Sequence, residues 1–312
     1  MGHRYTNPNP EHRPHDARAI FRWMVGDRLA GRRRIEPPGS PAPRIAPDLT
    51  EVRHPSAASQ LTWIGHASFL GSLSGAAFLI DPVFSERIGR FYRRHVAPGL
   101  LPHQLPSLRA LLVTHSHYDH LDRASIRSLP REVPVCVPLG LGRWFERHGF
   151  GQIHELGWWD SITVDPLRVT CVPARHWSRR GIGDTNRTLW GGFVVEAGGS
   201  SVYHAGDTAW FDGFPEIRRR FPELSAALLP IGAYSPAWFM EHHHLNPEQA
   251  GYAFLELGAV RMVPMHWGTF KLTDEPLVEP MERLRRWWST EVPGNGRRLD
   301  ELAIGQTMTW SR

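Results

Sequence analysis

From residue 60 onward, short apolar runs alternate with longer polar segments that carry apolar residues at helical spacing. The apolar runs are bounded by Gly, Pro, Asp or Asn, which is typical of strands that end in tight turns. They predict strands at residues 60–70, 76–81, 110–114, 133–137, 168–172, 190–196, 201–205, 226–230 and 261–265. The segments between them predict helices near residues 121–129, 141–149, 214–221, 247–257 and 277–288. This pattern predicts an α/β fold in which two sheets are faced by helices.

The longest apolar stretch, Leu61–Phe84, is the one that comes nearest to the length of a transmembrane segment. His66, the turn at Gly71–Gly75 and the pair Asp81-Pro82 interrupt it. Turn residues at these places favour two strands of a hairpin over a membrane span.

Residues 1–54 are predicted to form an N-terminal extension that is separate from the body of the chain, residues 55–312. Residues 1–16 are rich in Pro, His, Asn and Arg and are expected to be disordered, while Glu36–Pro43 is expected to be a stiff Pro-rich linker. The first 19 residues lack the apolar core of a signal peptide, so a cytoplasmic location is expected.

A basic amphipathic helix is predicted between these segments, at Ala17–Ala30. Pro14 favours a helix start, and apolar residues are interleaved with Arg18, Arg22 and Arg28. Two interpretations stay open: peripheral attachment of this helix to a membrane surface, or packing of its apolar stripe onto the body of the chain.

Composition narrows the class of protein further. An apolar content of 41% over 312 residues is enough for one large core. The net charge is 36 − 31 = +5, and residues 1–54 hold ten Arg against six acidic residues, so the excess lies mainly in the extension. Lys271 is the single Lys, which is typical of a GC-rich bacterial genome. Cys136 and Cys171 lie in apolar runs and are expected to be buried thiols rather than a disulfide.

The candidate chemistry lies directly after the apolar run at 110–113. Thr114–His120 reads Thr-His-Ser-His-Tyr-Asp-His, and His176, Asp207 and His266 follow later, each near Gly, Pro or another turn residue. Imidazole nitrogens and carboxylate oxygens are ligands of zinc, and loops that leave rigid strands can aim several of them at one point. The sequence therefore predicts a metal site.

These residues resemble the metallo-β-lactamase superfamily, whose signature is a His-x-His-x-Asp-His run followed by a lone His, a lone Asp and a last His. Further segments resemble the branch that contains the N-acylphosphatidylethanolamine-hydrolysing phospholipase D: Thr62–Ala67, Leu79–Ser85, Val137–Leu141, Gly157–Asp160, Ala205–Thr208, Pro230–Met240 and Met265–Phe270. The resemblance spans about residues 60–285 and implies an αββα sandwich of two mixed β-sheets faced by helices. Residues 55–312 are expected to form the hydrolase domain.

Carried over residue by residue, the resemblance implies two metal ions in each chain. One ion would be held by His115, His117 and His176, and the other by Asp119, His120 and His266. Asp207 would bridge the two ions. Such a pair activates a water and neutralises charge on the substrate, so no side-chain nucleophile is needed. Zn²⁺ suits five His and two Asp best, with manganese and iron as alternatives.

Several other residues are candidates for the site. Asp119 is also a candidate to orient the attacking water. The resemblance implies that His244, in the run His242–His244, binds a phosphate oxygen or protonates the leaving group. His242 and His243 are expected to be solvated.

Asp81 is a candidate to orient a ligating imidazole, with a simple strand-ending turn as the alternative. His66 would contact substrate, orient a ligand, or be an ordinary buried His. The apolar wall over the metals is assigned to Tyr118, Tyr234, Trp238, Phe239 and Met240, with a core role for Trp238 and Phe239 as the alternative.

The predicted function is a dinuclear zinc phosphodiesterase of the phospholipase D type, acting on lipid or other amphiphilic phosphodiesters. The alternative is a lactonase or other carbonyl-ester hydrolase, because the same metals polarise a carbonyl. The interval from Asp207 to His266 leaves no room for an inserted nucleic-acid domain, so no nucleic-acid partner is expected. A non-catalytic metal-binding scaffold at a membrane would be favoured by a missing ligand, and the ligand set is complete. The resemblance leaves a homodimer open.

Overall fold

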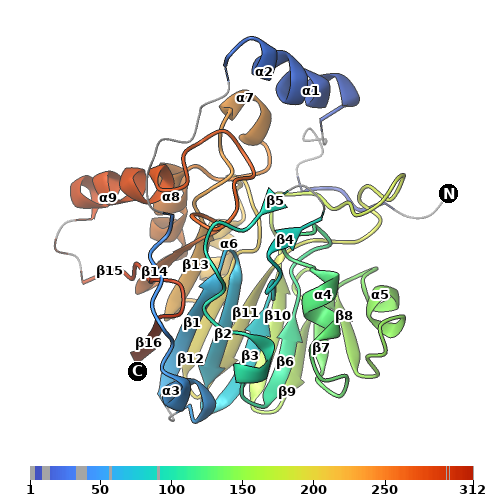
Figure 1. Ribbon diagram of the computed structural model, residues 1–312. Helices are drawn as coiled ribbons and strands as arrows, with labels where there is room; N and C mark the ends of the chain where they lie inside the picture. Colours follow the sequence, from blue (N-terminus) through green and yellow to red (C-terminus); the bar gives the residue numbers. More distant parts are fainter. Residues whose placement is uncertain are drawn as a thin grey trace.

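Two seven-stranded sheets face each other in the computed structural model, which describes residues 4–8, 15–32, 41–55, 58–89, 92–292, 294 and 296–311 (Figure 1). The first sheet runs in the order β16 (Thr307–Trp310), β1 (Ser59–Gly65), β2 (Ser68–Leu73), β3 (Ala76–Ile80), β6 (Leu108–Leu112), β7 (Val135–Pro138), β8 (Ile153–Leu156). The second runs β15 (Arg298–Leu299), β14 (Arg261–Met265), β13 (Ala226–Pro230), β12 (Ser200–His204), β11 (Gly192–Ala197), β10 (Leu167–Val172), β9 (Ser161–Val164).

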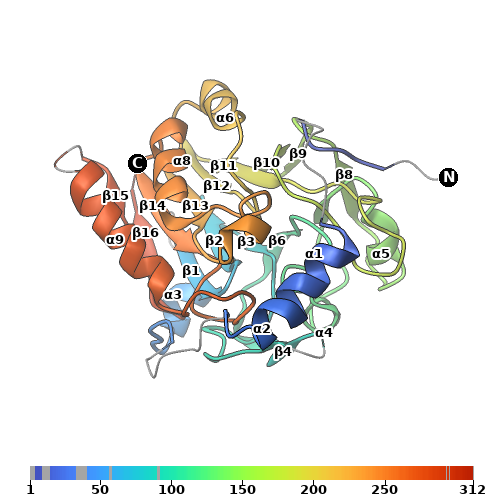
Figure 2. The same ribbon diagram turned by 90° about the horizontal axis from the view of Figure 1, so that it is seen from above.

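Helices cover the outer faces of both sheets, so the predicted αββα sandwich is confirmed (Figures 1 and 2). On the first sheet these are α3 (Leu49–Arg53), α4 (Arg123–Arg127) and α5 (Gly142–Glu146); on the second they are α6 (Phe214–Arg220), α8 (Pro247–Leu257) and α9 (Glu279–Glu291). Above the strand ends lie α7 (Ala237–Met240), the small hairpin β4 (Arg87–Ile88) and β5 (Tyr92–Arg93), and the N-terminal helix. That helix comprises α1 (Ala17–Phe21), a π-helical turn (Arg22–Gly26) and α2 (Asp27–Leu29).

The two halves of the sandwich share one pairing pattern. In each sheet, three antiparallel pairings are followed by three parallel ones: β16 to β3 and then β3 to β8 in the first, β9 to β12 and then β12 to β15 in the second. β1, β3 and β6 therefore end at one edge of the first sheet, and β10, β12 and β14 end at one edge of the second. Polar loops at these ends can meet.

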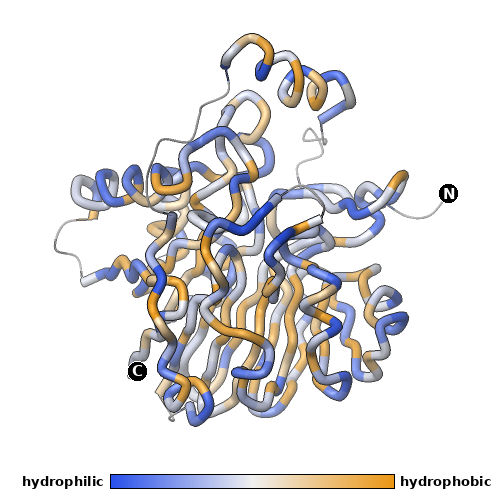
Figure 3. The backbone as a smooth tube through the Cα atoms, viewed as in Figure 1, coloured by the Kyte–Doolittle hydropathy of each residue, from blue (hydrophilic) through white to orange (hydrophobic). Residues whose placement is uncertain are grey.

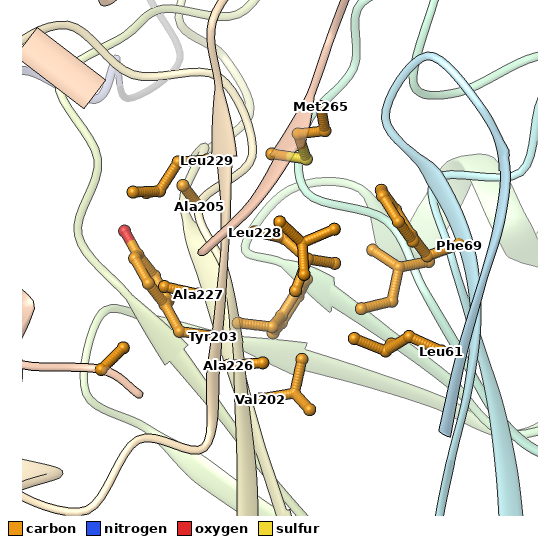
Figure 4. Packing of buried hydrophobic residues seen from close by; sticks show 14 of the residues in the cluster. Leu61, Phe69, Val202, Tyr203, Ala205, Ala226, Ala227, Leu228, Leu229 and Met265 are labelled. Atoms are coloured by element: carbon orange, nitrogen blue, oxygen red, sulfur yellow. The ribbon is translucent and has the colours of Figure 1, made fainter. Parts of the chain in front are cut away.

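The core lies between the sheets and is almost wholly apolar. Figure 4 shows Leu61 and Phe69 of the first sheet facing Leu228 and Met265 of the second. All four side chains are fully buried, and apolar strands of this kind run through the interior of the molecule in Figure 3. Burying an aliphatic or aromatic side chain stabilises the fold by about 1.5–3 kcal/mol, which makes this core a rigid base for the loops above it.

The structure corrects the prediction in several places. The single strand expected at 60–70 is two strands, because Gly65 (φ 127°) and His66 (φ 55°) turn the chain between β1 and β2. The pattern also missed β4, β5, β8, β9, β15, β16, α3 and α7. β9 alternates exposed and half-buried residues that include Ser161 and Thr163, and so lacks an apolar run. Among the described residues, no helix is long and apolar enough to cross a membrane.

The N-terminal extension is tied to the body at both ends. Residues 4–8 and His15 are bonded to it, and Asp16 caps the helix that follows, so the expectation of disorder is wrong there. Pro14 and the rest of 9–14 lie outside the described residues. Most of the predicted linker, residues 36–40, lies outside them too. Its last residues pack on the body: Ala42 is buried and donates its backbone N–H to the Gly268 carbonyl.

Candidate metal centre

Every predicted ligand residue lies just beyond the end of a strand, on the edge where the two sheets open. The run from His115 to His120 follows β6, while His176, Asp207 and His266 follow β10, β12 and β14. The structure brings all seven predicted ligands together from both sheets. The convergence arises because the strands of each sheet that carry these loops run in the same direction.

His115, His117 and His176 form the first group, together with Asp207. His115 Nε2 lies 2.9 Å from His117 Nδ1, and His176 Nε2 lies 3.2 Å from the same Nδ1 atom. Ligands that surround one zinc ion tetrahedrally at 2.0–2.1 Å are about 3.3 Å apart, so this spacing suits one ion. Burial holds the pKa of all three imidazoles below the ordinary value, that of His117 at about 4, which keeps them in the neutral form that binds metal.

Asp119, His120 and His266 form the second group. Asp119 Oδ2 lies 3.3 Å from His266 Nε2 and 3.6 Å from His120 Nε2. Asp207 stands between the groups: its Oδ1 is 3.2 Å from His266 Nε2, and its Oδ2 is 3.2 Å from His120 Nε2 and 3.7 Å from His176 Nε2. A carboxylate in this position suits a bridging ligand.

Charge and hydrogen bonding both fit bound cations. Burial alone would raise the pKa of Asp207 and lower that of His120, but their attraction outweighs it, so the carboxylate pKa falls and the imidazole pKa rises. The buried negative charge therefore needs a positive partner, which is either a proton on the imidazole or a metal ion. His120 Nε2, His266 Nε2 and Asp207 Oδ1 are buried and have no hydrogen-bond partner among the residues that the structure describes, as expected of atoms that coordinate an ion.

The backbone around the centre is strained at three residues that directly follow strands. His66, Asp81 and His266 all have positive φ, at 55°, 44° and 62°. Non-glycine residues in this region cost about 1–3 kcal/mol each and cluster at functional sites. Gly232 permits the close approach, since a Cβ there would lie 2.1 Å from the carbonyl oxygen of His266.

Asp81, at the end of β3, orients the ligand loop. It accepts from Thr114 N–H at 2.7 Å and Thr114 Oγ1 at 2.6 Å, and its Oδ2 lies 2.7 Å from His120 Nδ1. With Nδ1–H of His120 donated to this carboxylate, Nε2 is left free for a metal. Of the two interpretations from the sequence, the structure favours the orienting role.

We expect Asp81→Ala to lower metal affinity at the second group by about 10–100-fold, the usual range for such an outer partner. The reason is that His120 loses its acceptor and Thr114 loses the acceptor of its buried N–H. Metal retention during chelator titration measures the effect. Asp48→Ala, which removes only the N-cap of α3, is the matched control, and equal retention in both variants would contradict the orienting role.

His66 is buried and its Nε2 lies 3.0 Å from Asp119 Oδ2. Its backbone carbonyl accepts from His266 N–H, so it supports two members of the second group. Burial, with the neighbouring His266, lowers the pKa of His66 to about 3, and the neutral ring donates to the carboxylate. The geometry favours ligand orientation over the other two roles considered for His66.

The run after α7 sits beside the centre. The ring of His244 lies 5.2 Å from that of His176 and 5.5 Å from that of His266. The expectation that His243 is solvated is wrong: its side chain is 6% exposed, and its carbonyl oxygen accepts from His176 Nδ1 at 2.9 Å. The loop that carries His243 packs against the loop after β10, and this contact between distant segments cannot be predicted from the sequence. His242 is half-buried.

A cavity of about 630 Å³ opens onto the metal centre. His117, Asp119, Asp207 and His244 form its polar floor. Its remaining lining is largely apolar and includes Trp23, Ile88, Tyr92, Tyr118, Trp177, Phe239, Met240 and Leu272. A volume of this size suits a small-molecule or lipid-like ligand.

Two predicted wall residues are corrected. Tyr234 does not line the cavity, because its hydroxyl donates to Glu279 Oε1 at 2.7 Å and its ring lies under Arg283, toward α9. Trp238 does not line it either, because it packs under Arg22 of the N-terminal helix. Trp23 takes part in the wall in their place, stacked on Phe239 at 4.8 Å.

Sequence reasoning missed Trp177 and Trp23. Trp177 directly follows the ligand His176, which is a usable signal for a residue at the cavity. Trp23 lies on a helix more than two hundred residues before Phe239 in the chain. The hydrophobic pattern of that helix predicts an apolar stripe but not what the stripe contacts.

The αββα sandwich and the paired His and Asp groups at its open edge define a class of metal-dependent hydrolases. The sequence profile described as "Beta-lactamase superfamily domain" matches residues 77–267. An uncharacterised protein of Mycobacterium tuberculosis is 36% identical, over 91% of this chain and 79% of its own length. The N-acyl-phosphatidylethanolamine-hydrolyzing phospholipase D 1 of Caenorhabditis elegans is 34% identical, over 72% of this chain and 68% of its own.

A solved structure agrees with the fold. Igni18, a metallo hydrolase of the archaeon Ignicoccus hospitalis, has a TM-score of 0.62 at 23% identity and covers 82% of this chain and 99% of its own. The chain belongs to the metallo-β-lactamase superfamily and is a metal-dependent hydrolase.

Proposed function

We propose that the protein is a dinuclear zinc phosphodiesterase of the phospholipase D type, which hydrolyses lipid or other amphiphilic phosphodiesters. The observation that carries the proposal is the cavity, whose polar floor at Asp119, Asp207 and His244 adjoins a largely apolar wall. A substrate that fills it needs a charged reacting group beside a long apolar part. The likeness to the phospholipase D of Caenorhabditis elegans supports the same substrate class.

The residues of the chain have separate roles in this reaction. Two bound zinc ions would supply an activated water and would neutralise the phosphodiester charge. Asp119, hydrogen-bonded to His66, orients the attacking water, and His244 contacts a phosphate oxygen or gives a proton to the leaving oxygen. Tyr118 lines the cavity, and its hydroxyl donates to the carbonyl of Arg180.

A panel of substrates tests the proposal. The purified protein, with its metal content measured, is assayed on a chromogenic phosphodiester, a micellar N-acyl phospholipid and an acyl lactone under equal conditions. We expect hydrolysis of both phosphodiesters, with the phospholipid preferred. Hydrolysis of the lactone alone would overturn the proposal in favour of a carbonyl-ester hydrolase.

Peripheral contact with an anionic lipid surface is part of the proposed function. One face of the N-terminal helix packs on the body, where Trp23 is buried against Phe239. Its other side exposes Phe21 and Leu29 at 65% and 83%, beside exposed Met24 and Val25. Exposed arginines lie on the same helix and just after it: Arg18, Arg22, Arg28 and Arg32. An apolar strip flanked by cations suits insertion among anionic headgroups.

We expect the double change Phe21→Ser and Leu29→Ser to reduce co-sedimentation with anionic vesicles and activity on micellar substrate, because the inserting strip is lost. A small soluble phosphodiester should still be hydrolysed at the normal rate, since Trp23 still packs on Phe239. Val260→Ser, an apolar residue 52% exposed outside this helix, is the control. Unchanged sedimentation of the double variant would contradict the lipid contact.

A further inference from the structure

The first described segment of the chain lies against the loop that carries a candidate metal ligand. The Arg4 guanidinium donates to the carbonyl of Thr185 at 2.9 Å, and Tyr5 N–H donates to the carbonyl of Asn186 at 2.8 Å. These contacts bring Asn7 beneath the centre, where it is 8% exposed.

Asn7 makes two hydrogen bonds to the backbone of one residue, His176. Its Nδ2 donates to the His176 carbonyl at 2.8 Å, and His176 N–H donates to its Oδ1 at 3.1 Å. His176 lies beyond the end of β10, and the side-chain amide of Asn7 takes the place of a neighbouring strand. Buried backbone groups without such partners destabilise a fold, so the pairing selects this conformation of the loop.

The ring of His176 is held separately. Its Nδ1 donates to the carbonyl of His243 at 2.9 Å, and its Nε2 faces His117 and Asp207. Asn7 thus fixes the backbone position of the ligand while His243 fixes the rotation of the ring. His115 and His117 follow directly from β6, so His176 is the member of its group that depends on a distant part of the chain.

We propose that Asn7 is a positioning residue for the first metal group, and that the segment at residues 4–8 completes the metal centre by holding His176 in place. The inference rests on the metal centre of the proposed function but not on the substrate. An outer-shell contact of this kind is expected to change metal affinity by about 10–100-fold.

The test compares full-length Asn7→Ala with the wild type after both are loaded with two zinc ions. Chelator titration followed by elemental analysis should show that the variant loses one ion at a chelator concentration about 10–100-fold lower, while the other ion is retained as in the wild type. Cobalt-loaded samples should show an altered visible absorption for one of the two ions only. Thr6→Ala changes the exposed neighbour of Asn7 and is the matched control.

Two further variants separate positioning from general stability. Asn7→Asp keeps an acceptor for His176 N–H but sets a carboxylate against the His176 carbonyl, so it should retain metal no better than Asn7→Ala. Asn7→Gln keeps both amide groups and should recover part of the lost affinity, and it carries the test if Asn7→Ala does not fold. Equal loss of both ions, or wild-type retention in Asn7→Ala and Asn7→Asp, would overturn the inference. Because metal binding is measured, a failure of the phosphodiesterase assay would leave this result unaffected.

Discussion

Asp207→Ala should leave the protein without its two-metal centre and without hydrolytic activity. Asp207 lies between the two ligand groups, with Oδ1 at 3.2 Å from His266 Nε2 and Oδ2 at 3.2 Å from His120 Nε2. Its removal takes a ligand from both ions and leaves Asp119 as the one carboxylate of the predicted ligand set to offset the mutual repulsion of two cations. We expect a loss of activity well beyond the roughly 10–100-fold typical of an outer-shell change.

Elemental analysis of the purified variants decides this prediction. Asp207→Asn should retain one ion, because an amide oxygen still coordinates weakly but brings no charge to hold a second cation. Asp212→Ala, which removes an exposed carboxylate five residues further on, should keep both ions and full activity. Two ions per chain in Asp207→Ala would show that Asp207 does not bridge.

The fold class and the residues of the ligand set could be predicted from the sequence because both depend on local sequence patterns. A His-rich run after an apolar strand, and single ligands after other apolar strands, can be read directly along the chain. Their convergence could not be read from spacing; it came from the resemblance, and in the structure it follows from the shared direction of β6, β10, β12 and β14.

What the sequence did not predict depends on contacts between distant segments. Asn7 lies 169 positions from His176, in a stretch whose composition suggested disorder. Tyr234 belongs to a segment that resembles an active-site wall, yet its hydroxyl is drawn toward Glu279 of α9. The hydroxyl of a buried Tyr needs a hydrogen-bond partner, and the position of that partner decides where the side chain points. The partner cannot be identified without the tertiary structure.

The N-terminal helix illustrates the same limit. Its sequence left two interpretations open: packing on the body or attachment to lipid. These were alternatives for a single apolar stripe. In the structure the helix presents Trp23 to the cavity and exposes Phe21 and Leu29 on its other side. Packing is therefore an observation, while attachment stays a proposal for the exposed face.

His244→Ala should lower turnover without lowering metal content. His244 lines the floor of the cavity, and its ring lies close to those of His176 and His266. Burial lowers the pKa of His244 to about 4, so the imidazole is neutral at neutral pH and its N–H donates a hydrogen bond. This state favours contact with a phosphate oxygen over proton transfer to the leaving oxygen. Loss of a positioned group of this kind should reduce kcat by roughly 10²–10⁴-fold.

His242→Ala is the matched control, since His242 is half-buried on the same loop and is not among the cavity-lining residues. His243 would be a poor control because its side chain is buried in the cavity wall. The decisive measurement is kcat together with zinc per chain. His244, Asp207 and His266 could themselves hold an ion, so loss of one zinc in His244→Ala would make His244 a ligand. Two retained ions with a low kcat, and a normal rate in His242→Ala, would place it at the reacting group instead.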